Sequence, residues 1–179
     1  METKTLIKMY ALYQNNYPGS HDEQEHDPTK GASAGAVAEQ ARVTKAQDSS
    51  ALIDGISKVR PDLRGYISSY TPEEYAKKGT KIYMSDDNQS GFGINPDGEL
   101  ISVFSNVSGR GGDLVRQAVS LGANHLDCYE KPDTKKLVRL YASFGFVETE
   151  RMTWDDQYAP PGWDYEKNDN PDVVVMARP

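Results

Sequence analysis

Cysteine is almost absent from this chain, whose 179 residues include a single one, Cys128. One thiol excludes an internal disulfide, and we therefore expect a reducing compartment. No apolar run approaches the ~20 residues that a membrane helix needs. The N-terminus also lacks the apolar segment and small-residue cleavage site of a secretory signal. Together these absences predict a cytoplasmic protein without a membrane span.

Positive charge and hydrophobic residues are also scarce. Twenty lysines and arginines against 27 acidic residues leave a net charge of −7, and hydrophobic residues make up 37% of the chain. Excess negative charge disfavours nucleic acid and anionic membranes as partners, and it is compatible with amine substrates or basic partners. The low hydrophobic content indicates that part of the chain is loop or loosely held tail. The histidines predict no metal site, because His21 and His26 stand in an acidic loop and His125 stands alone.

The first 64 residues have the weakest patterning. Residues 5–13 predict a strand, residues 14–33 a polar loop or disordered linker, and residues 34–46 a segment of helical composition. Ser49 and Ser50 predict the start of a short helix that Pro61 ends. We therefore expect a loosely organised N-terminal extension over 1–64, able to contribute a first strand and helices, and a folded domain over 65–179.

From residue 71 onward the patterns are clear. Thr71-Pro72-Glu73-Glu74 is a capping box with proline at the first helical position, and Gly79 ends that helix. Strands over 81–85, 91–95 and 100–106, separated by strong turn sequences, predict an antiparallel meander. The remaining expected elements are a helix with Leu114, Val115, Ala118, Val119 and Leu121 on one side, a strand over 125–129, a helix over 134–144, and strands over 147–153 and 172–176.

A glycine-rich turn, Ser108-Gly109-Arg110-Gly111-Gly112-Asp113, joins the third strand of the meander to the next helix. Such a turn exposes backbone N–H groups at a helix N-terminus, where the helix dipole also favours an anion. This arrangement suits the pyrophosphate of a nucleotide-like cofactor. The alternative is a glycine turn that binds nothing, since turn glycines are common.

The order of these elements resembles the second half of the GNAT superfamily, the acyl-CoA-dependent N-acyltransferases. The resemblance spans roughly residues 81–179, and its most specific part is the Y-x-x-x-G-F ending of Tyr141-Ala142-Ser143-Phe144-Gly145-Phe146. Many family members carry R/Q-x-x-G-x-G/A in the loop. This chain has Val107-Ser108-Gly109-Arg110-Gly111-Gly112, with Val107 at the usual Arg or Gln and Arg110 at the middle glycine. The implied fold is α/β (α+β), with a central, mostly antiparallel mixed sheet flanked by helices.

The resemblance also implies a site. Acetyl-CoA is the implied cofactor, bound through Phe104, Ser105, Val107, Gly109, Arg110, Gly111, Gly112 and Asp113. Tyr141 matches the family position whose hydroxyl protonates the departing thiolate, and a phenol is protonated at neutral pH. The alternative for Tyr141 is that it only packs its helix onto the sheet. We expect the Asp113 side chain to point away from the phosphates.

The general base is not identified by the sequence. Glu99 starts the strand before the loop, and Glu148, Glu150, Asp155 and Asp156 lie on or after the strand that begins at 147. Each is also compatible with a purely solvated surface role. Cys128 is expected to be a small buried residue rather than a nucleophile.

A bulky insertion, Trp154–Tyr165, follows that strand. Its aromatic rings alternate with carboxylates, and prolines stiffen it; Trp154, Asp155, Asp156, Tyr158 and Trp163 are the candidate substrate-binding residues. The segment is compatible with a roof over an acceptor pocket that attracts a cationic amine. It is equally compatible with a docking face for a protein partner or with a loop packed against its own sheet.

Two functions of different classes follow. The first is an N-acetyltransferase that acts on an amine of a protein or small molecule. The second is a GNAT-like protein without catalysis that serves as an interaction or structural accessory protein, of the kind that bacteriophage genomes encode, in which case it would lie in the host cytoplasm or the virion. A dinucleotide-binding Rossmann unit fits less well, because a meander precedes the loop and no acidic ribose ligand ends the next strand.

Overall fold

The structure is a computed structural model, and it describes residues 41–64, 67–130, 135–159 and 163–179. The expected elements over 5–13 and 14–33 lie outside these ranges. In chain order the elements are β1 (Val43–Lys45), α2 (Ser50–Ser57), α3 (Pro61–Arg64), α4 (Pro72–Lys78), β2 (Lys81–Ser85), β3 (Ser90–Ile94), β4 (Leu100–Ser105), α5 (Gly111–Ser120), β5 (His125–Glu130), α6 (Lys136–Ala142), β6 (Val147–Met152), the 3-10 turn η2 (Asp156–Tyr158), α7 (Tyr165–Asn168) and β7 (Asp172–Ala177).

The first sheet is a four-stranded antiparallel meander in the order β1-β2-β3-β4. The expected strands over 81–85, 91–95 and 100–106 are therefore confirmed, and so is their antiparallel pairing. The helical composition of residues 34–46 does not produce a helix in the described part, because Val43–Lys45 is the edge strand β1. Gln117 of α5 supports this edge from outside the sheet: its side-chain amide accepts from Val43 N at 2.9 Å and donates to Ala41 O at 2.9 Å.

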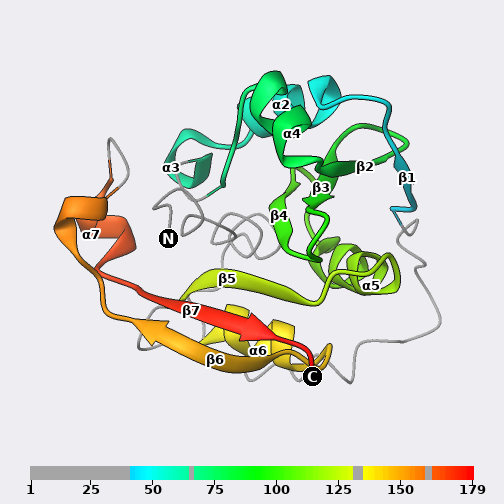
Figure 1. The fold of residues 1–179 in the computed structure, drawn as a ribbon. Helices are drawn as coiled ribbons and strands as arrows, with labels where there is room; N and C mark the ends of the chain where they lie inside the picture. The colour runs from blue at the N-terminus through cyan, green and yellow to red at the C-terminus, as the bar shows by residue number, and fades with distance from the viewer. Residues whose placement is uncertain (1–40, 65–66, 131–134, 160–162) are drawn as a thin grey trace, which may run out of the picture.

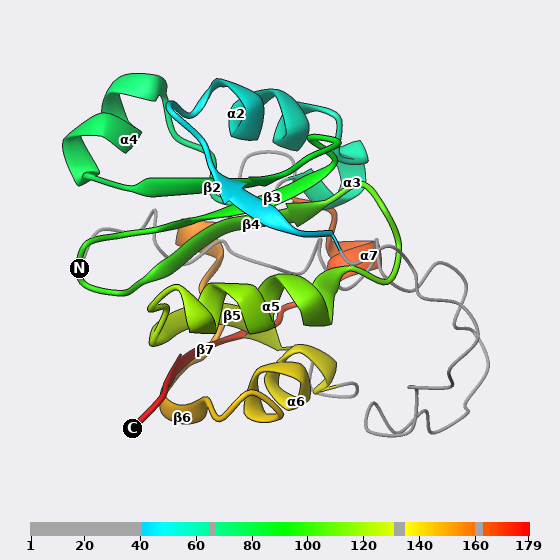
Figure 2. The same ribbon diagram turned by 90° about the vertical axis from the view of Figure 1, so that its right-hand side faces the viewer.

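The second sheet has three antiparallel strands in the order β5-β7-β6. α6 packs against β5 and β6. Figure 2 shows the helices α2 and α4 above the first sheet and α5 below it. The expected fold class, a mixed α/β arrangement of antiparallel sheets flanked by helices, is confirmed.

The two sheets meet where β4 and β5 begin. These strands run parallel and share one isolated bridge, Glu99–His125, after which each belongs to its own sheet. We call this point of separation the fork. In β4 the register to β3 shifts by one residue between Gly91 and Gly93, so that an extra residue is accommodated in β4. Ser102 lies within this bulge at φ 53, a left-handed backbone conformation that non-glycine residues seldom adopt.

One core holds the early and late parts of the chain together. Leu52 and Ile56 of α2 are buried in the same cluster as Phe104 of β4 and Leu126 of β5. Contact between α2 and β4 is close: a Cβ at Gly55 would lie 2.3 Å from Phe104 Cζ. Residues of the expected extension 1–64 therefore pack in the same core as the domain expected over 65–179.

Most helix signals in the sequence agree with the structure. In the predicted capping box, Glu74 N donates to Thr71 Oγ1 at 3.2 Å and Thr71 N donates to Glu74 Oε2 at 2.9 Å. Gly79 ends α4 in the left-handed conformation, as expected. Pro61 begins α3, and Leu121, expected on the apolar side of α5, is 42% exposed. Within the described ranges, none of the helices has the length and apolar character needed to cross a membrane.

Candidate functional site

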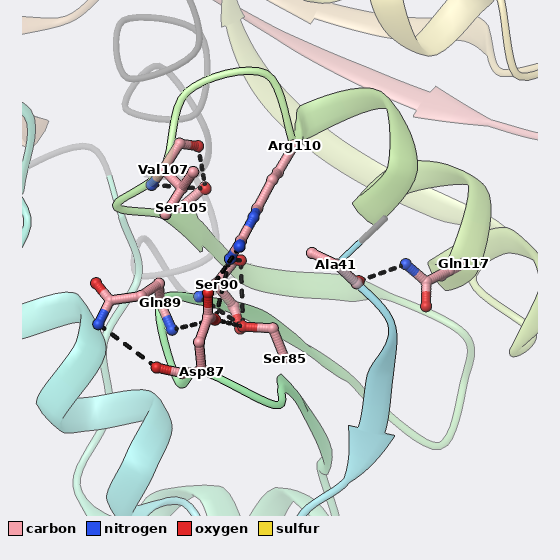
Figure 3. A network of polar contacts seen from close by, with 9 residues as sticks. All are labelled: Ala41, Ser85, Asp87, Gln89, Ser90, Ser105, Val107, Arg110 and Gln117. Atoms are coloured by element: carbon pink, nitrogen blue, oxygen red, sulfur yellow. Dashed lines mark hydrogen bonds and ion pairs between the residues drawn. The ribbon is translucent and has the colours of Figure 1, made fainter. Parts of the chain in front are cut away.

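The loop between β4 and α5 is fixed by its own polar groups. Ser105 Oγ donates to Val107 O at 2.6 Å and accepts from Val107 N at 3.1 Å. Asn106 N donates to Gln89 O at 2.7 Å, and its side-chain Nδ2 donates to Gly55 O at 3.0 Å. Two amides of the predicted cofactor loop, those of Asn106 and Val107, are thus engaged within the protein (Figure 3 shows the Ser105–Val107 pair).

The next amides begin α5, with Arg110 as the N-cap. The first intrahelical bond runs from Leu114 N to Arg110 O at 3.0 Å. The N–H groups of Gly111, Gly112 and Asp113 precede it, and such first-turn groups have no acceptor within their own helix. Gly111 is buried, but there is space beside two other glycines: a Cβ at Gly109 would meet nothing within 4 Å, and one at Gly112 would meet only Phe144 Cζ, at 4.0 Å. Gly109 also needs to be glycine, because its φ is +86°.

The Arg110 side chain turns toward the β2–β3 connection (Figure 3). Nη1 and Nη2 donate to the two carboxylate oxygens of Asp87 at 3.0 and 2.6 Å, and Nη1 also donates to Ser90 Oγ at 2.9 Å. Ser85 Oγ donates to the same carboxylate at 2.7 Å. The hydrogen bonds from Arg110 hold the pKa of Asp87 well below its usual range. Three guanidinium contacts are therefore made to the protein, and a contact to phosphate stays a prediction.

Two further predicted cofactor residues have side chains engaged elsewhere. The Asp113 carboxylate forms an ion pair with Arg116, one turn along α5, which agrees with the expectation that it does not face a phosphate. The Phe104 ring is fully buried and lies against Gly55 and Gly91 in the core. If Phe104 contacts a cofactor, its backbone would have to do so.

Tyr141 lies on α6 and is fully buried, with its ring packed edge-on against Phe146 at a centroid distance of 5.8 Å. Burial raises the pKa of its phenol well above 10, with smaller contributions from Cys128 and Asp127. The hydroxyl is therefore protonated at neutral pH. Tyr141 packs α6 onto β5, which is one of the two alternatives given above for this residue. Its role as an acid stays a prediction.

The insertion forms a compact aromatic cluster on its own sheet. The Trp154 and Trp163 rings lie 4.4 Å apart, and Tyr129 of β5 lies 5.5 Å from Trp163. Asp156 Oδ1 accepts from Trp154 Nε1 at 2.7 Å and from the exposed Tyr165 hydroxyl at 2.9 Å. Asp155 caps η2 by accepting from Gln157 N at 3.0 Å. Tyr158 is the last residue of η2. Of the three alternatives for this segment, packing against its own sheet is what the contacts show.

The predicted cofactor and substrate residues lie on elements at opposite sides of one view of the molecule: Figure 1 shows α5 on the right of β4 and β5, and α7 on the left.

The carboxylates weighed as bases differ in their surroundings. Glu148 forms an ion pair with Arg151 at 2.8 Å, which lowers its pKa. Glu99 accepts from Asn95 Nδ2 at 2.9 Å, and Glu150 is exposed. A further carboxylate, Asp127 of β5, is 4% exposed and was missed. One signal was present: an acidic residue interrupts the apolar strand His125-Leu126-Asp127-Cys128-Tyr129.

Comparison with known proteins finds similarity of low level among solved structures, where three chains match. No family model matches the chain, and no curated protein matches it. Among solved structures it is similar to "a putative phosphinothricin N-acetyltransferase", at 15% sequence identity and a TM-score of 0.44, over 76% of this chain and 96% of the other. A likeness at this level supports neither a family nor a function.

Proposed function

We propose that this protein is an N-acyltransferase of the GNAT type, which transfers an acetyl group from acetyl-CoA to an amine. One observation carries the proposal: the parallel strands β4 and β5 meet at the isolated bridge Glu99–His125 and then pair within separate sheets, and β4 leads into a glycine loop and the first amides of α5. The resemblance noted for residues 81–179 predicts this order of elements.

The residues present fit a diphosphate. A diphosphate needs several N–H donors on one side and backbone that it can approach closely. The amides of Gly112 and Asp113 in the first turn of α5 are such donors, and the open space beside Gly109 and Gly112 permits the approach. The ionic side chains at this helix start are already paired, Arg110 with Asp87 and Asp113 with Arg116. We therefore assign the diphosphate contact mainly to backbone amides.

When bound, acetyl-CoA supplies an activated acyl group as a thioester. The chain's own residues have three tasks: to hold the diphosphate, to polarise the carbonyl, and to manage the protons of the amine and the thiol. We assign the proton for the thiol to Tyr141, whose phenol keeps its proton because burial raises its pKa. The aromatic cluster of Trp154, Trp163 and Tyr165 is our candidate for the wall on the acceptor side.

Calorimetry with coenzyme A tests the proposal most directly. We expect saturable binding with a dissociation constant of roughly 1 µM to 1 mM, the common range of KM values for enzymes. ATP, titrated at the same concentrations, controls for unspecific attraction of polyphosphates. Release of free thiol from acetyl-CoA in the presence of primary amines tests catalysis. Absence of binding at millimolar coenzyme A contradicts the proposal.

A second candidate is the protein without catalysis, acting as an interaction partner. Two observations favour it: the Arg110 guanidinium is bound to Asp87, and the Tyr141 hydroxyl is fully buried. Coenzyme A binding without thiol release, on any amine tested, would favour this candidate over the enzyme. The bacteriophage resemblance stays a prediction under either candidate.

A further inference from the structure

The turn between β2 and β3 contacts both ends of the loop that leads from β4 into α5. At the start of the loop, Asn106 N donates to Gln89 O at 2.7 Å. At its end, the Arg110 guanidinium donates to the carboxylate of Asp87 and to Ser90 Oγ. The loop and the turn are distant in the chain, so this double contact depends on the fold of the first sheet.

One carboxylate serves both contacts. Asp87 accepts from Nη1 and Nη2 of Arg110 at 3.0 and 2.6 Å. Its Oδ1 also accepts from Gln89 N at 3.0 Å, and Gln89 is the residue whose carbonyl accepts from Asn106. Asp87 therefore holds the end of the loop directly and its start through the backbone of Gln89 (Figure 3 shows Asp87, Gln89 and Arg110).

Two buried serines complete the network. Ser85 Oγ donates to Asp87 Oδ1 at 2.7 Å. Ser90 Oγ accepts from Arg110 Nη1 at 2.9 Å and donates to Ser85 Oγ at 3.3 Å. Ser85 is 3% exposed and Ser90 is fully buried. The four side chains form a closed ring of hydrogen bonds, and a buried network of this kind holds its members in one arrangement.

The Arg110 guanidinium is largely committed to this ring. Both hydrogens of Nη1 are used, one toward Asp87 and one toward Ser90, and Nη2 donates to the second oxygen of Asp87. The Arg110 side chain is 17% exposed. A phosphate that took this guanidinium would have to displace a two-point, charge-assisted pair.

The backbone of Arg110 sits where α5 begins. It is the N-cap residue, and its carbonyl accepts the first intrahelical bond, from Leu114 N at 3.0 Å. The amides of Gly112 and Asp113 follow in the first turn. Fixing the side chain of the N-cap residue therefore also fixes the direction in which these amides point.

The loop needs such anchors because of its own sequence. Arg110 has Gly109 before it and Gly111 and Gly112 after it, and glycine has the greatest backbone freedom of all residues. A ligand that binds a flexible turn must also order it, which reduces the affinity. Anchors at both ends of the loop order it before the ligand arrives.

We infer that Asp87 is a positioning residue of the proposed coenzyme A site, which holds both ends of the glycine loop so that the amides of Gly112 and Asp113 face the diphosphate. The inference rests on the proposed function. It gives Arg110 the same positioning role. The alternative, in which Arg110 is itself a phosphate ligand, predicts the opposite effect of removing the Asp87 charge, because the released guanidinium would then be available to the phosphate.

Calorimetry with coenzyme A tests the inference in the full chain, with Asp87→Asn, Arg110→Lys and the double variant. We expect Asp87→Asn to weaken binding about tenfold, the order expected when one hydrogen bond to a charged group is lost. Arg110→Lys should lose a similar factor, because lysine keeps the charge but cannot make the two-point contact. The double variant should bind within about twofold of the weaker single variant, since both substitutions break the same pair.

Two control variants separate positioning from stability. Asp86→Asn removes an exposed carboxylate of the same turn. Thr71→Ala removes the N-cap of α4, so it lowers the melting temperature without touching the loop. Measured at a temperature at which every variant is folded, both should bind coenzyme A as the parent does. With acetyl-CoA, Asp87→Asn should raise KM and leave kcat within about twofold, because the pair acts on the binding turn and not on the reacting atoms.

Four outcomes overturn the inference. If Asp87→Asn binds coenzyme A as tightly as the parent, the pair does not position the loop; if it binds more tightly, Arg110 is a phosphate ligand. An equal loss of affinity in Thr71→Ala would reduce the effect to stability. A fall in kcat without a rise in KM would place the pair in the chemistry instead. Arg110→Lys decides the question if Asp87→Asn does not fold. A parent that binds no coenzyme A contradicts the proposed function itself, before any variant is compared.

Discussion

Arg110 and Asp87 form a two-point ion pair, in which Nη1 and Nη2 lie 3.0 and 2.6 Å from the two carboxylate oxygens. Twenty-three residues separate them in the chain. The pair ties the β2–β3 connection to the residue that caps α5 (Figure 3). The position of the first helical turn, and of its amides, is therefore set partly by a turn in another part of the sheet.

Replacing Asp87 by asparagine should destabilise the protein by about 1 kcal/mol, because a bidentate, partly exposed ion pair is lost. The effect should depend on pH. Since the pKa of Asp87 in the folded state is depressed below its ordinary value of 3.8, the stabilisation is complete above that value and is lost as pH falls through the folded-state pKa. Melting temperatures of parent and variant should differ by about 3 °C from pH 5 to 8 and converge below pH 3.

The neighbouring Asp86 supplies the control. It is exposed in the same turn, and Asp86→Asn should leave the melting temperature unchanged. A difference between parent and Asp87→Asn that persists undiminished at pH 2 would contradict the role of the ionised carboxylate.

The Arg110–Asp87 pair also illustrates what sequence patterns predict and what they do not. The meander strands and α4 agree closely with the sequence predictions, because their signals are local: the Thr71 capping box, the turn sequences and the β-branched and aromatic residues of β4. The sequence does not predict η2 and α7 within the insertion. The edge strand β1 lies in a segment of helical composition, so its own sequence does not predict a strand. Its pairing with β2 and its contact with Gln117 involve residues far along the chain, and such tertiary contacts override local propensity. The sequence does not predict Asp87 as the partner of Arg110 either, because this contact also joins distant parts of the chain.

Gly112→Ala should separate cofactor binding from stability. Gly112 lies in the first turn of α5, and an added Cβ would meet only Phe144, at 4.0 Å. Alanine favours a helix more than glycine does, so we expect an unchanged or slightly raised melting temperature. The new methyl group fills the open space beside the amides, and coenzyme A affinity should fall about tenfold, or by about 1.4 kcal/mol.

Ser120→Ala at the far end of the same helix is the matched control. Its Oγ donates only to Gln117 O, and the substitution should change neither affinity nor folding appreciably. Equal coenzyme A affinity in the parent and Gly112→Ala would show that the diphosphate does not lie against this turn.

Cys128 should be inert in the native protein. It was expected to be a small buried residue, and its side chain is fully buried in β5. Burial, with Asp127 and Glu130 nearby, raises the pKa of the thiol far above its ordinary value. Labelling by an aromatic disulfide reagent at pH 8 should therefore be at least roughly 100-fold slower than in guanidinium chloride, because the thiolate is the reactive form. Glutathione under both conditions provides the reference rate. Native labelling at the denatured rate would mean that β5 is not packed as described.

The sequence predicts the candidate site less completely than it predicts the fold. In the sequence, Tyr141 and the glycine loop stand out because they match a family pattern. The structure places this loop directly before the first-turn amides of α5. Asp127 interrupts a strand of mostly buried residues, and only the fold shows that this carboxylate is itself buried.

Tyr141→Phe tests the proposed proton donor. The ring is fully buried and packs against Phe146, and phenylalanine keeps that packing, so the fold and the coenzyme A affinity should be retained. If the phenol donates the proton to the thiolate, kcat should fall about 100-fold with little change in the KM for acetyl-CoA. Tyr83→Phe is the control, because Tyr83 is also a buried tyrosine packed on a phenylalanine, with its ring 5.5 Å from Phe92 in the first sheet. A parental kcat in Tyr141→Phe would leave this residue with the packing role alone. Because its pKa is raised, the Tyr141 phenol can donate its proton only to a sulfur atom in direct contact with it. An equal, partial loss of kcat in Tyr141→Phe and Tyr83→Phe would therefore also contradict the role of Tyr141 as proton donor.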